Sequence, residues 1–242
     1  MIIILPMAGR GSRFSNYGID TPKPLINIKG KPMVWWALQS LKGITYSKLI
    51  VVALAKHERK YGLIDVFRKM GFRDFEYVLL NEFTEGQLCT VLSAKDYIND
   101  DEEILITSSD TYVLSDLGKD IKKKSVECRG IISVANVPGE QWSFARTDQN
   151  GKVIEVAEKK KISNNVSTGI YYFSRGNEFL DTANEIIKSR RKTKGEYYII
   201  PVFQDYINKG RDVRLSQAKQ MWDMGTPEAK INFELFLDQN KY

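Results

Sequence analysis

Short apolar runs alternate with amphipathic segments through the first half of this 242-residue chain. Apolar runs bounded by polar turns are typical of buried strands, and apolar residues spaced three or four apart are typical of helices that cover a sheet. The pattern predicts strands over residues 2–5, 48–54, 75–80 and 103–107, and helices over 32–41, 57–70 and 87–98. This β-α-β-α order predicts an α/β fold: a Rossmann-like, mostly parallel sheet flanked by helices on both faces.

The pattern changes after about residue 117, where strand-like alternation becomes more frequent. The turn Asp148-Gln149-Asn150-Gly151 lies between two alternating runs, and Asn-Gly in that setting predicts a β-hairpin. The hairpin strands are predicted over 142–147 and 152–156, further strands over 129–137, 166–173 and 214–218, and helices over 176–188, 197–208 and 227–237. No linker or composition break is visible, so we expect one domain over 1–242, with a mixed β extension that forms one wall of a cleft.

Composition narrows the class of protein. A hydrophobic fraction of 43% and a charged fraction of 27% are ordinary for a globular protein, and no apolar run approaches the ~18 residues of a membrane-spanning helix. The N-terminus lacks the basic n-region of a secretion signal, and Cys89 and Cys128 are far apart, so we expect a cytoplasmic protein with reduced thiols. The single histidine, His57, argues against histidine metal sites and against Ser-His or Cys-His catalysis.

The net charge of +6 suits a polyanionic ligand such as a nucleoside triphosphate. Basic runs such as Lys122-Lys123-Lys124 also fit solvated helix ends, and no aromatic-interleaved RNA-binding motif is present. We therefore expect neither nucleic acid nor a membrane as a partner, and the sequence carries no signal for an oligomeric state.

A glycine-rich turn, Gly9-Arg10-Gly11-Ser12-Arg13, directly follows the first strand. Glycines let backbone N–H groups approach an anion closely, and the cations of Arg13 and Lys23 can reach phosphate oxygens. The turn is not a P-loop, because no G-x-x-x-x-G-K-[ST] follows the strand, and it lacks the third glycine of a dinucleotide fingerprint. The alternative is an ordinary turn with two solvated cations.

Three further segments follow predicted strands, at the edge where open α/β sheets bind ligands. In residues 84–90, the amide of Gln87 can both donate to and accept from the edge of a nucleobase. In residues 106–111, Asp110 follows a buried strand and is either a magnesium ligand or a simple helix cap. Asp223, just before the predicted last helix, is a candidate second carboxylate.

These motifs resemble the nucleotidyltransferase family that makes sugar nucleotides and related activated phosphates. That family opens with a strand, G-x-G-[ST]-R and a lysine in a K-P pair, matched here by residues 9–13 and by Lys23-Pro24. Its late W-x-D-x-G-T-P-E segment is matched by residues 222–228. The resemblance implies the nucleotide-diphospho-sugar transferase fold, with a nucleotide-binding half over 1–117 and an acceptor-binding half over 118–242.

The resemblance also implies a role for each candidate residue. Arg13 would stabilise a leaving pyrophosphate, and Lys23 would bridge the α-phosphate and the acceptor. Asp110 and Asp223 would share one Mg²⁺ ion, the expected cofactor. The implied nucleotide contacts are Met7, Ala8, Gly9, Gly11, Ser12, Gln87, Thr90 and Ser109. The implied acceptor contacts are Trp142, Glu158, Lys159, Gly169 and Tyr198.

Several of the acceptor contacts have alternatives. Lys160 and Lys161 compete with Lys159 for the acceptor phosphate, and aromatic residues such as Trp142 and Tyr197 are also typical of a core. In the expected acceptor wall, residues 142–171, Glu158 is the one acid placed beside a lysine run, and we expect it to pair with acceptor hydroxyls or with an ammonium group.

The implied reaction is attack of a phosphate monoester on the α-phosphorus of a nucleoside triphosphate, with pyrophosphate leaving. The nucleophile is already an anion, so no general base is needed, in agreement with a chain that has one histidine. The chain is similar to the small transferases that supply capsule and surface-glycan precursors. That similarity favours CTP as the triphosphate, with a sugar 1-phosphate or another small phosphorylated metabolite as acceptor.

Two other classes of protein share parts of this pattern. A glycosyltransferase of the related fold usually carries D-x-D at the metal strand, whereas Asp110 has no second acid two positions away. A non-catalytic nucleotide-binding module would have no need of Arg13, Lys23 and both aspartates together.

Overall fold

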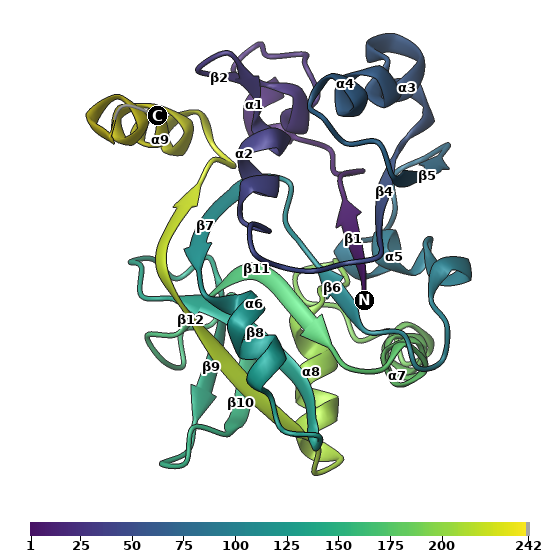
Figure 1. The fold of residues 1–242 in the computed structure, drawn as a ribbon, viewed down its shortest axis with the longest axis vertical. Coiled ribbons are helices and arrows are strands. Elements are labelled where there is room, and N and C mark those ends of the chain that lie inside the picture. The colour runs from purple at the N-terminus through teal and green to yellow at the C-terminus, as the bar shows by residue number, and fades with distance from the viewer. Residues whose placement is uncertain (241–242) are drawn as a thin grey trace.

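The strands of the first half pair in parallel. In the computed structural model, which describes residues 1–240, β1 (Ile2–Pro6) lies between β4 (Lys48–Leu54) and β6 (Ile104–Ile106), and β5 (Phe75–Leu80) lies beyond β4 (Figure 1). The apolar side chains of β1, β4 and β6 are buried on both faces, as their continuous apolar runs predict. Because these strands are parallel, the turns that follow them meet at one edge of the sheet.

Helices cover both faces of this sheet, and a buried apolar cluster fills the space on each side. One face is covered by α5 (Gln87–Leu92), α7 (Gly176–Lys188) and α8 (Ile200–Asn208), and the other by α2 (Met33–Gln39), α4 (Leu63–Lys69) and α6 (Leu117–Lys123). The α/β fold class predicted from the sequence is therefore confirmed.

The helix predicted over 57–70 is two helices, α3 (Ala55–Tyr61) and α4. Gly62 between them has a φ of 59°, a left-handed conformation that ends an α-helix. The helix predicted over 87–98 likewise stops at Leu92, and a 3₁₀ turn, η2 (Lys95–Tyr97), follows.

Short elements follow the glycine turn: α1 (Ser12–Ser15), the 3₁₀ helix η1 (Lys23–Leu25), and a ribbon of β2 (Asn27–Ile28) and β3 (Lys31–Pro32).

The second half extends the same sheet with mixed pairing. β11 (Val166–Phe173) runs antiparallel to both β6 and β8 (Cys128–Ala135) and so joins the two halves. β12 (Asp212–Asp223) is parallel to β8 along its first part and antiparallel to β7 (Thr111–Ser115) along its last part. The predicted mixed β extension is present.

Three elements from residue 111 onward differ from those that the sequence pattern predicts: β7, α6 and β12. The strand predicted over 214–218 is 12 residues long, because β8 and β7 pair with successive parts of it. The pattern does not predict β7 or α6, since a short apolar run directly after polar residues is indistinguishable from a loop.

The predicted hairpin is formed by β9 (Ser143–Thr147) and β10 (Val153–Glu158), at the lower end of the molecule in Figure 1. At its turn, Asp148 Oδ1 accepts hydrogen bonds from the backbone N–H groups of Asn150 and Lys152, each at 2.9 Å. This side-chain acceptor stabilises the turn that the Asn-Gly pair predicts.

The last two helices differ in whether their first residue agrees with the prediction from the sequence. The helix predicted over 197–208 starts only at Ile200, as α8, because the backbone of Tyr197 bonds instead to the loop before α5. The last helix, α9 (Pro227–Asn240), begins as predicted, with the N–H of Ala229 donating to Thr226 Oγ1 at 3.1 Å.

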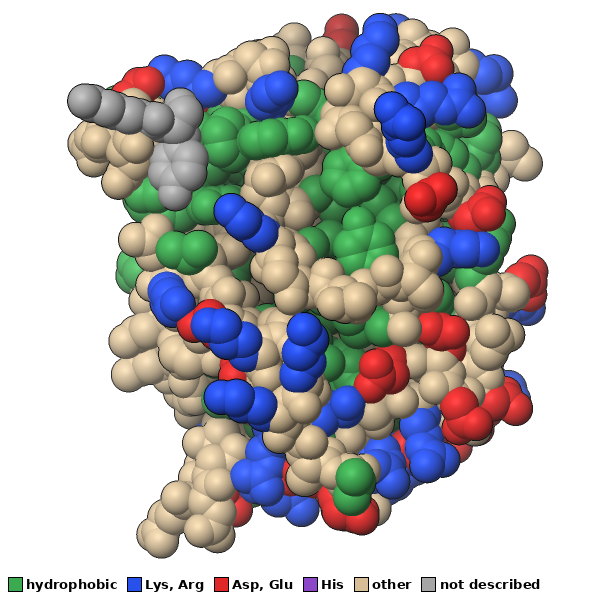
Figure 2. All heavy atoms as spheres, in the orientation of Figure 1, with side chains coloured by type: hydrophobic (Ala, Val, Ile, Leu, Met, Phe, Trp, Pro, Cys, Tyr) green, Lys and Arg blue, Asp and Glu red, His purple; other side chains and the backbone are tan. Residues whose placement is uncertain are grey.

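In Figure 2, charged side chains of both signs lie along the rims and over the lower half of the molecule, around hydrophobic ones in the upper half, and basic side chains are most frequent over α6 and the strands beside it. Some of these cations are paired: the Nζ atoms of Lys119 and Lys219 lie 2.8 and 2.6 Å from carboxylate oxygens of Asp116. Exposed pairs of this kind contribute little to stability, so we interpret this face as an ordinary solvated surface. Within residues 1–240, no helix combines the length and apolarity needed to cross a bilayer.

Candidate active site

The glycine turn packs against the segment that carries Lys23. Gly11 has a φ of 65°, and a Cβ added there would lie 3.5 Å from the Cβ of Lys23. Pro22 and Pro24, on either side of Lys23, are buried, and their rings fix the backbone from which the lysine extends. Lys23 is therefore held beside the turn rather than free on the surface.

The other predicted residues of the turn line the same edge of the sheet. Met7 and Ala8 are each 3% exposed, and Met7 continues the pairing of β1 through its N–H to the carbonyl oxygen of Val52 at 2.8 Å. Space is open around Gly9, where a Cβ added to the backbone would have no heavy atom within 4 Å, and Ser12 begins α1. The turn is thus anchored at the strand and accessible at its glycines.

Lys23 forms an ion pair with Asp110, which lies between β6 and β7. Lys23 Nζ is 2.5 Å from Asp110 Oδ2, and Ser108 donates a hydrogen bond to the other carboxylate oxygen. Burial alone would raise the pKa of Asp110, but the Lys23 ammonium and the Ser108 hydroxyl outweigh it and hold that pKa below its usual value. Asp110 precedes a strand, so the helix-cap alternative for this residue is wrong.

The pairing of β12 with β7 brings Asp223 to the same place. Asp223 lies opposite Thr111 in the register, and the N–H of Met224 donates to the carbonyl oxygen of Asp110 at 2.8 Å. A Cβ added at Gly225 would lie 3.0 Å from Asp110 Oδ2 and 3.0 Å from Asp223 Oδ1. The two carboxylates therefore flank one point, which only a residue without a side chain leaves open.

The proximity of the two carboxylates shows in the proton affinity of Asp223. Burial and the neighbouring Asp110 charge raise the pKa of Asp223 to about 6, although Arg13 and Lys23 act in the opposite direction. The folded protein thus holds this proton more tightly than the unfolded chain does. The stabilising contribution is full below about pH 4 and is lost as the pH rises through about 6.

We therefore expect Asp223→Asn to raise the melting temperature at pH 8, by about 3–8 °C, and to change it little at pH 4. The reason is that the amide keeps the acceptor for the Gly225 N–H, a bond of 3.0 Å, but carries no charge beside Asp110. Calorimetry with a chelator present measures both values, and Asp181→Asn, on an exposed position of α7, is the matched control. An unchanged or lower melting temperature at pH 8 would contradict the electrostatic account.

The donor set at this point fits a magnesium ion. Mg²⁺ prefers oxygen ligands and usually takes one or two carboxylates together with water and substrate phosphates. Asp110 and Asp223 supply two carboxylates around the space that Gly225 leaves open. Within residues 1–240 no group of three or more His, Cys, Asp or Glu side chains could hold a metal, so the remaining ligands would come from substrate and water.

The predicted nucleotide contacts at the start of α5 and after β6 differ in whether their side chains already form hydrogen bonds within the protein. Gln87 begins α5, and within residues 1–240 its amide has no hydrogen-bond partner. The hydroxyl of Thr90 bonds to Thr84 at 2.6 Å and to the carbonyl oxygen of Gly86 at 3.2 Å, so it is already used within the loop. Ser109, 7% exposed, lies directly before Asp110. Among these, Gln87 is the side chain most available to a ligand.

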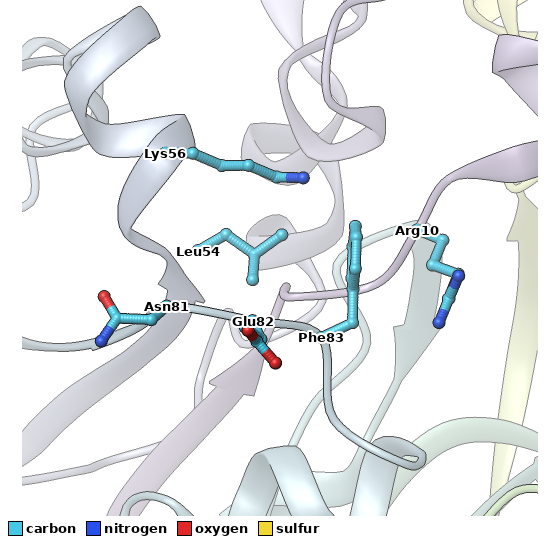
Figure 3. A pocket seen from close by; sticks show the side chains of 6 residues that line it. All are labelled: Arg10, Leu54, Lys56, Asn81, Glu82 and Phe83. Carbon is cyan, nitrogen blue, oxygen red and sulfur yellow. The ribbon is translucent and has the colours of Figure 1, made fainter.

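A hollow of about 270 Å³ opens beside the glycine turn, at the carboxyl ends of β4 and β5 (Figure 3). Arg10 and Lys56 lie on opposite sides of the Phe83 ring, 5.0 and 4.4 Å from its centroid, and neither forms an ion pair within residues 1–240. Two cations held over an aromatic ring add positive charge next to the turn. The sequence pattern misses this group, because its three side chains come from separate segments: the glycine turn, the first turn of α3 and the loop before α5.

The predicted acceptor residues lie at the hairpin, on β11 and, for Tyr198, just before α8. Ser143 donates a hydrogen bond to Glu158, and burial, reinforced by the charge of Glu196, raises the pKa of Glu158. Gly169, with a φ of 81°, lies in an irregularity of β11, where a Cβ would come within 3.2 Å of the Ser108 side chain. Gly169 thus brings β11 close to the loop that carries Asp110.

The lysine of this side contacts an aromatic ring. Lys159 Nζ hydrogen-bonds to the hydroxyl of Tyr198 and lies 4.5 Å from the centroid of its ring. Trp142 is fixed by its own ring N–H, which donates to the carbonyl oxygen of Pro138 at 2.9 Å. Tyr197 is 3% exposed and belongs to the core, as the core alternative for these aromatics predicts.

Glu196, outside the expected wall of residues 142–171, is a second acid close to Glu158. Its Oε2 accepts a hydrogen bond from the Tyr198 hydroxyl at 2.8 Å, and its charge acts on Glu158. The sequence gives no periodic signal for it, because it lies in a turn. Ser108, in contrast, belongs to the same Ser-Ser-Asp motif that predicts Asp110, so its role beside this carboxylate can be predicted from the sequence.

The chain matches one protein-family description along nearly its whole length. The family described as Nucleotidyl transferase matches residues 2–240. The chain is 27% identical over 246 residues to the bifunctional protein GlmU of Methanocaldococcus jannaschii, covering 100% of this chain and 54% of that protein. It thus spans about half the length of several curated relatives. It is also 26% identical to the glucose-1-phosphate thymidylyltransferase of Mycolicibacterium smegmatis, covering 97% of this chain and 81% of that enzyme.

Solved structures give the same likeness. A nucleoside-diphosphate-sugar pyrophosphorylase from Vibrio cholerae superposes with a TM-score of 0.82 at 26% identity, covering 96% of this chain and 99% of that one. A UDP-glucose pyrophosphorylase in complex with UDP-glucose superposes with a TM-score of 0.80 at 16% identity, covering 99% and 98%. At that lower identity the second likeness concerns the fold alone.

Proposed function

Because this chain belongs to the nucleotidyl transferase family, we propose that it joins a nucleoside triphosphate to a phosphorylated small molecule and releases pyrophosphate. The observation that carries this proposal is the convergence of Lys23, Asp110 and Asp223 beside the glycine turn. Open backbone at the glycines suits phosphate oxygens, and the cation and carboxylates suit a reaction that depends on charge neutralisation.

The chemistry needs positioning more than acid-base catalysis. An oxygen of the acceptor phosphate attacks the α-phosphorus, the bond from that phosphorus to the oxygen bridging it to the β-phosphate breaks, and pyrophosphate leaves with the electron pair. Lys23, held between two buried prolines, would contact the α-phosphate as the acceptor approaches. Arg13, exposed on α1, would contact the leaving pyrophosphate.

Asp110 and Asp223 would hold the divalent ion. When bound there, Mg²⁺ would supply charge neutralisation for phosphate oxygens. The chain's own contribution is to keep the two carboxylates together through the β7–β12 pairing and to leave space at Gly225.

We assign the nucleotide to residues 1–117 and the acceptor to residues 118–242. On the nucleotide side, the free amide of Gln87 and the cations around Phe83 support this division. On the acceptor side, the division is supported by Glu158 and Lys159, which project from the antiparallel extension. Each substrate would then be bound by its own part of the sheet.

For the base we propose a pyrimidine. The glucose-1-phosphate thymidylyltransferase among the similar proteins is named for a pyrimidine nucleotide, and CTP, UTP and dTTP all carry a pyrimidine. The role in capsule precursors and the preference for CTP remain predictions from the sequence. Sugar 1-phosphates are the first acceptors to test, followed by smaller phosphorylated compounds.

A pyrophosphate-release assay tests the proposal directly. CTP, UTP, dTTP, GTP and ATP are each combined with glucose 1-phosphate, phosphocholine or phosphoglycerol in the presence of Mg²⁺. We expect release that requires one triphosphate and one acceptor together. Transfer of sugar from a nucleotide sugar without pyrophosphate release would indicate a glycosyltransferase, and nucleotide binding without any release would indicate a binding module.

Glu158→Gln is expected to raise the KM of the acceptor about fivefold and to leave that of the triphosphate nearly unchanged. Glu158 lies on β10, and Ser143 donates a hydrogen bond to one of its carboxylate oxygens. The other oxygen is left for the acceptor's hydroxyls or amine. Steady-state kinetics with each substrate varied separately measures both constants. Glu155→Gln, on the same strand and paired with Arg146, is the control, and an equal rise for both substrates would mean that the acceptor lies elsewhere.

A further inference from the structure

Residues 192–198 contact both the segment that begins α5, on the proposed nucleotide side, and Lys159, on the proposed acceptor side. On the nucleotide side, the N–H of Tyr197 donates to the carbonyl oxygen of Glu85 at 3.0 Å, and its carbonyl accepts from the N–H of Leu88 at 3.1 Å. Lys192 Nζ lies 2.7 Å from Glu85 Oε1. A Cβ added at Gly86 would come within 2.4 Å of the Tyr197 carbonyl oxygen, so this close contact requires glycine. The segment is therefore attached firmly to the start of α5.

The tip of this segment is a tight turn that fixes Glu196. The backbones of Thr193 and Glu196 exchange two hydrogen bonds, at 3.0 and 3.1 Å. Lys194 and Gly195 between them have φ values of 48° and 85°, which are the left-handed conformations of a two-residue hairpin turn. Glu196 thus has a defined backbone position although its side chain is exposed.

Tyr198 connects Glu196 to Lys159 on the proposed acceptor side through its hydroxyl group. Its hydroxyl has a single proton, which it donates to Glu196 Oε2 at 2.8 Å. A lone pair of the same oxygen accepts a hydrogen bond from Lys159 Nζ. Burial and the bond to Glu196 raise the pKa of Tyr198, so the hydroxyl keeps its proton at neutral pH.

Lys159 has an unusual backbone conformation and one side-chain contact for its ammonium group. It has a φ of 55°, which is uncommon for a residue with a side chain, and its N–H donates to the carbonyl oxygen of Trp142 at 2.8 Å. No carboxylate forms an ion pair with Lys159 within residues 1–240. Tyr198 is the one side chain to which its ammonium hydrogen-bonds in that part of the chain.

From these contacts we infer that Glu196 is a positioning residue: it orients the Tyr198 hydroxyl, which in turn holds Lys159 beside Glu158 to meet the acceptor's phosphate. The contact of Lys159 with that phosphate rests on the proposed function, whereas the chain Glu196–Tyr198–Lys159 does not. The neighbouring Lys160 and Lys161 are exposed, and among the described residues, 1–240, no hydrogen bond or ion pair holds their side chains, which distinguishes Lys159 from the rest of the run.

Chemical labelling tests the chain of contacts without any substrate. The full-length protein is treated briefly with acetic anhydride, and the acetylation rates of Lys159 and Lys160 are compared by peptide mass spectrometry. We expect Lys159 to react more slowly than Lys160, and Tyr198→Phe or Glu196→Ala to raise the Lys159 rate about fivefold while Lys160 is unchanged. An unchanged Lys159 rate in Glu196→Ala would overturn the inference, even if the enzyme proves active.

Kinetics then tests the role of this positioning with the acceptor that the pyrophosphate assay identifies. Glu196→Ala and Tyr198→Phe are each expected to raise the KM of the acceptor about fivefold, with little change in the KM of the triphosphate. Because the two residues act through the same contact, the acceptor KM of the double variant should rise no further than that of either single variant. Glu196→Gln should retain nearly wild-type values, because its amide oxygen accepts the same hydrogen bond. Glu185→Ala, which removes an exposed carboxylate paired with Lys209, is the control.

The outcomes of the two experiments separate the inference from the proposed function. If Glu196→Gln is as defective as Glu196→Ala, or if both substrates weaken equally, Glu196 does not act through the Tyr198 hydroxyl. If no triphosphate and acceptor pair releases pyrophosphate, the proposed function fails, but the labelling rates still decide whether Glu196 positions Lys159.

Discussion

Asp110→Asn is expected to reduce turnover about 1,000-fold while the protein remains folded. The substitution removes one of the two carboxylates that flank the open point at Gly225, and it leaves the Lys23 ammonium without its ion-pair partner. Asp223→Asn should have an effect of similar size through the same ion. Pyrophosphate release over a range of Mg²⁺ concentrations measures the loss, and circular dichroism measures the folding.

Asp101→Asn provides the matched control for these two variants, because Asp101 is 90% exposed, faces Arg175 rather than Lys23, and precedes β6, whereas Asp110 follows that strand. Its turnover should equal that of the wild type at every magnesium concentration. A full rate for Asp110→Asn at low millimolar magnesium would mean that this carboxylate only pairs with Lys23.

Lys23→Ala is expected to lower turnover by roughly 100-fold or more, with a smaller loss of triphosphate affinity. Lys23 is 25% exposed and is held by Pro22, Pro24 and the Asp110 carboxylate, so its charge is already oriented before substrate arrives. Pre-steady-state turnover and equilibrium binding of the triphosphate separate the two effects.

The exposed lysine at the end of α2 provides the comparison: Lys42→Ala removes the same charge from the chain without touching the site. Turnover of Lys23→Ala within about threefold of wild type would show that this lysine does not contact the reacting phosphate.

The sequence predicts best the parts of the molecule in which local pattern and burial agree. Continuous apolar runs such as residues 48–54 can be satisfied only inside a parallel sheet, so their strands and their shared edge follow from the sequence. The glycine turn, Lys23 and Asp110 lie at that edge and could be predicted as neighbours from the order of the elements. Gly62 shows the limit of periodicity, since the apolar spacing continues through a residue whose backbone ends the helix.

Residues brought together by long-range pairing could not be predicted in this way. Asp223 meets Asp110 because β12 changes partner from β8 to β7, and no local pattern encodes that change; only the family resemblance suggested it. Glu196 is more hidden still, because its role depends on the hydroxyl of Tyr198 and on a turn whose side chains follow no period.

The pairing of β12 with β7 also has a consequence for how the protein is made. The parallel strands β1, β4 and β6 lie in the first half of the chain and can associate early in synthesis, but Asp223 follows the last of them by more than 100 residues. Closing so long a stretch of chain is slow compared with forming local helices. A nascent chain can therefore bury part of its core before the two carboxylates meet, and chemical competence requires that β12 has been made and has paired with β7.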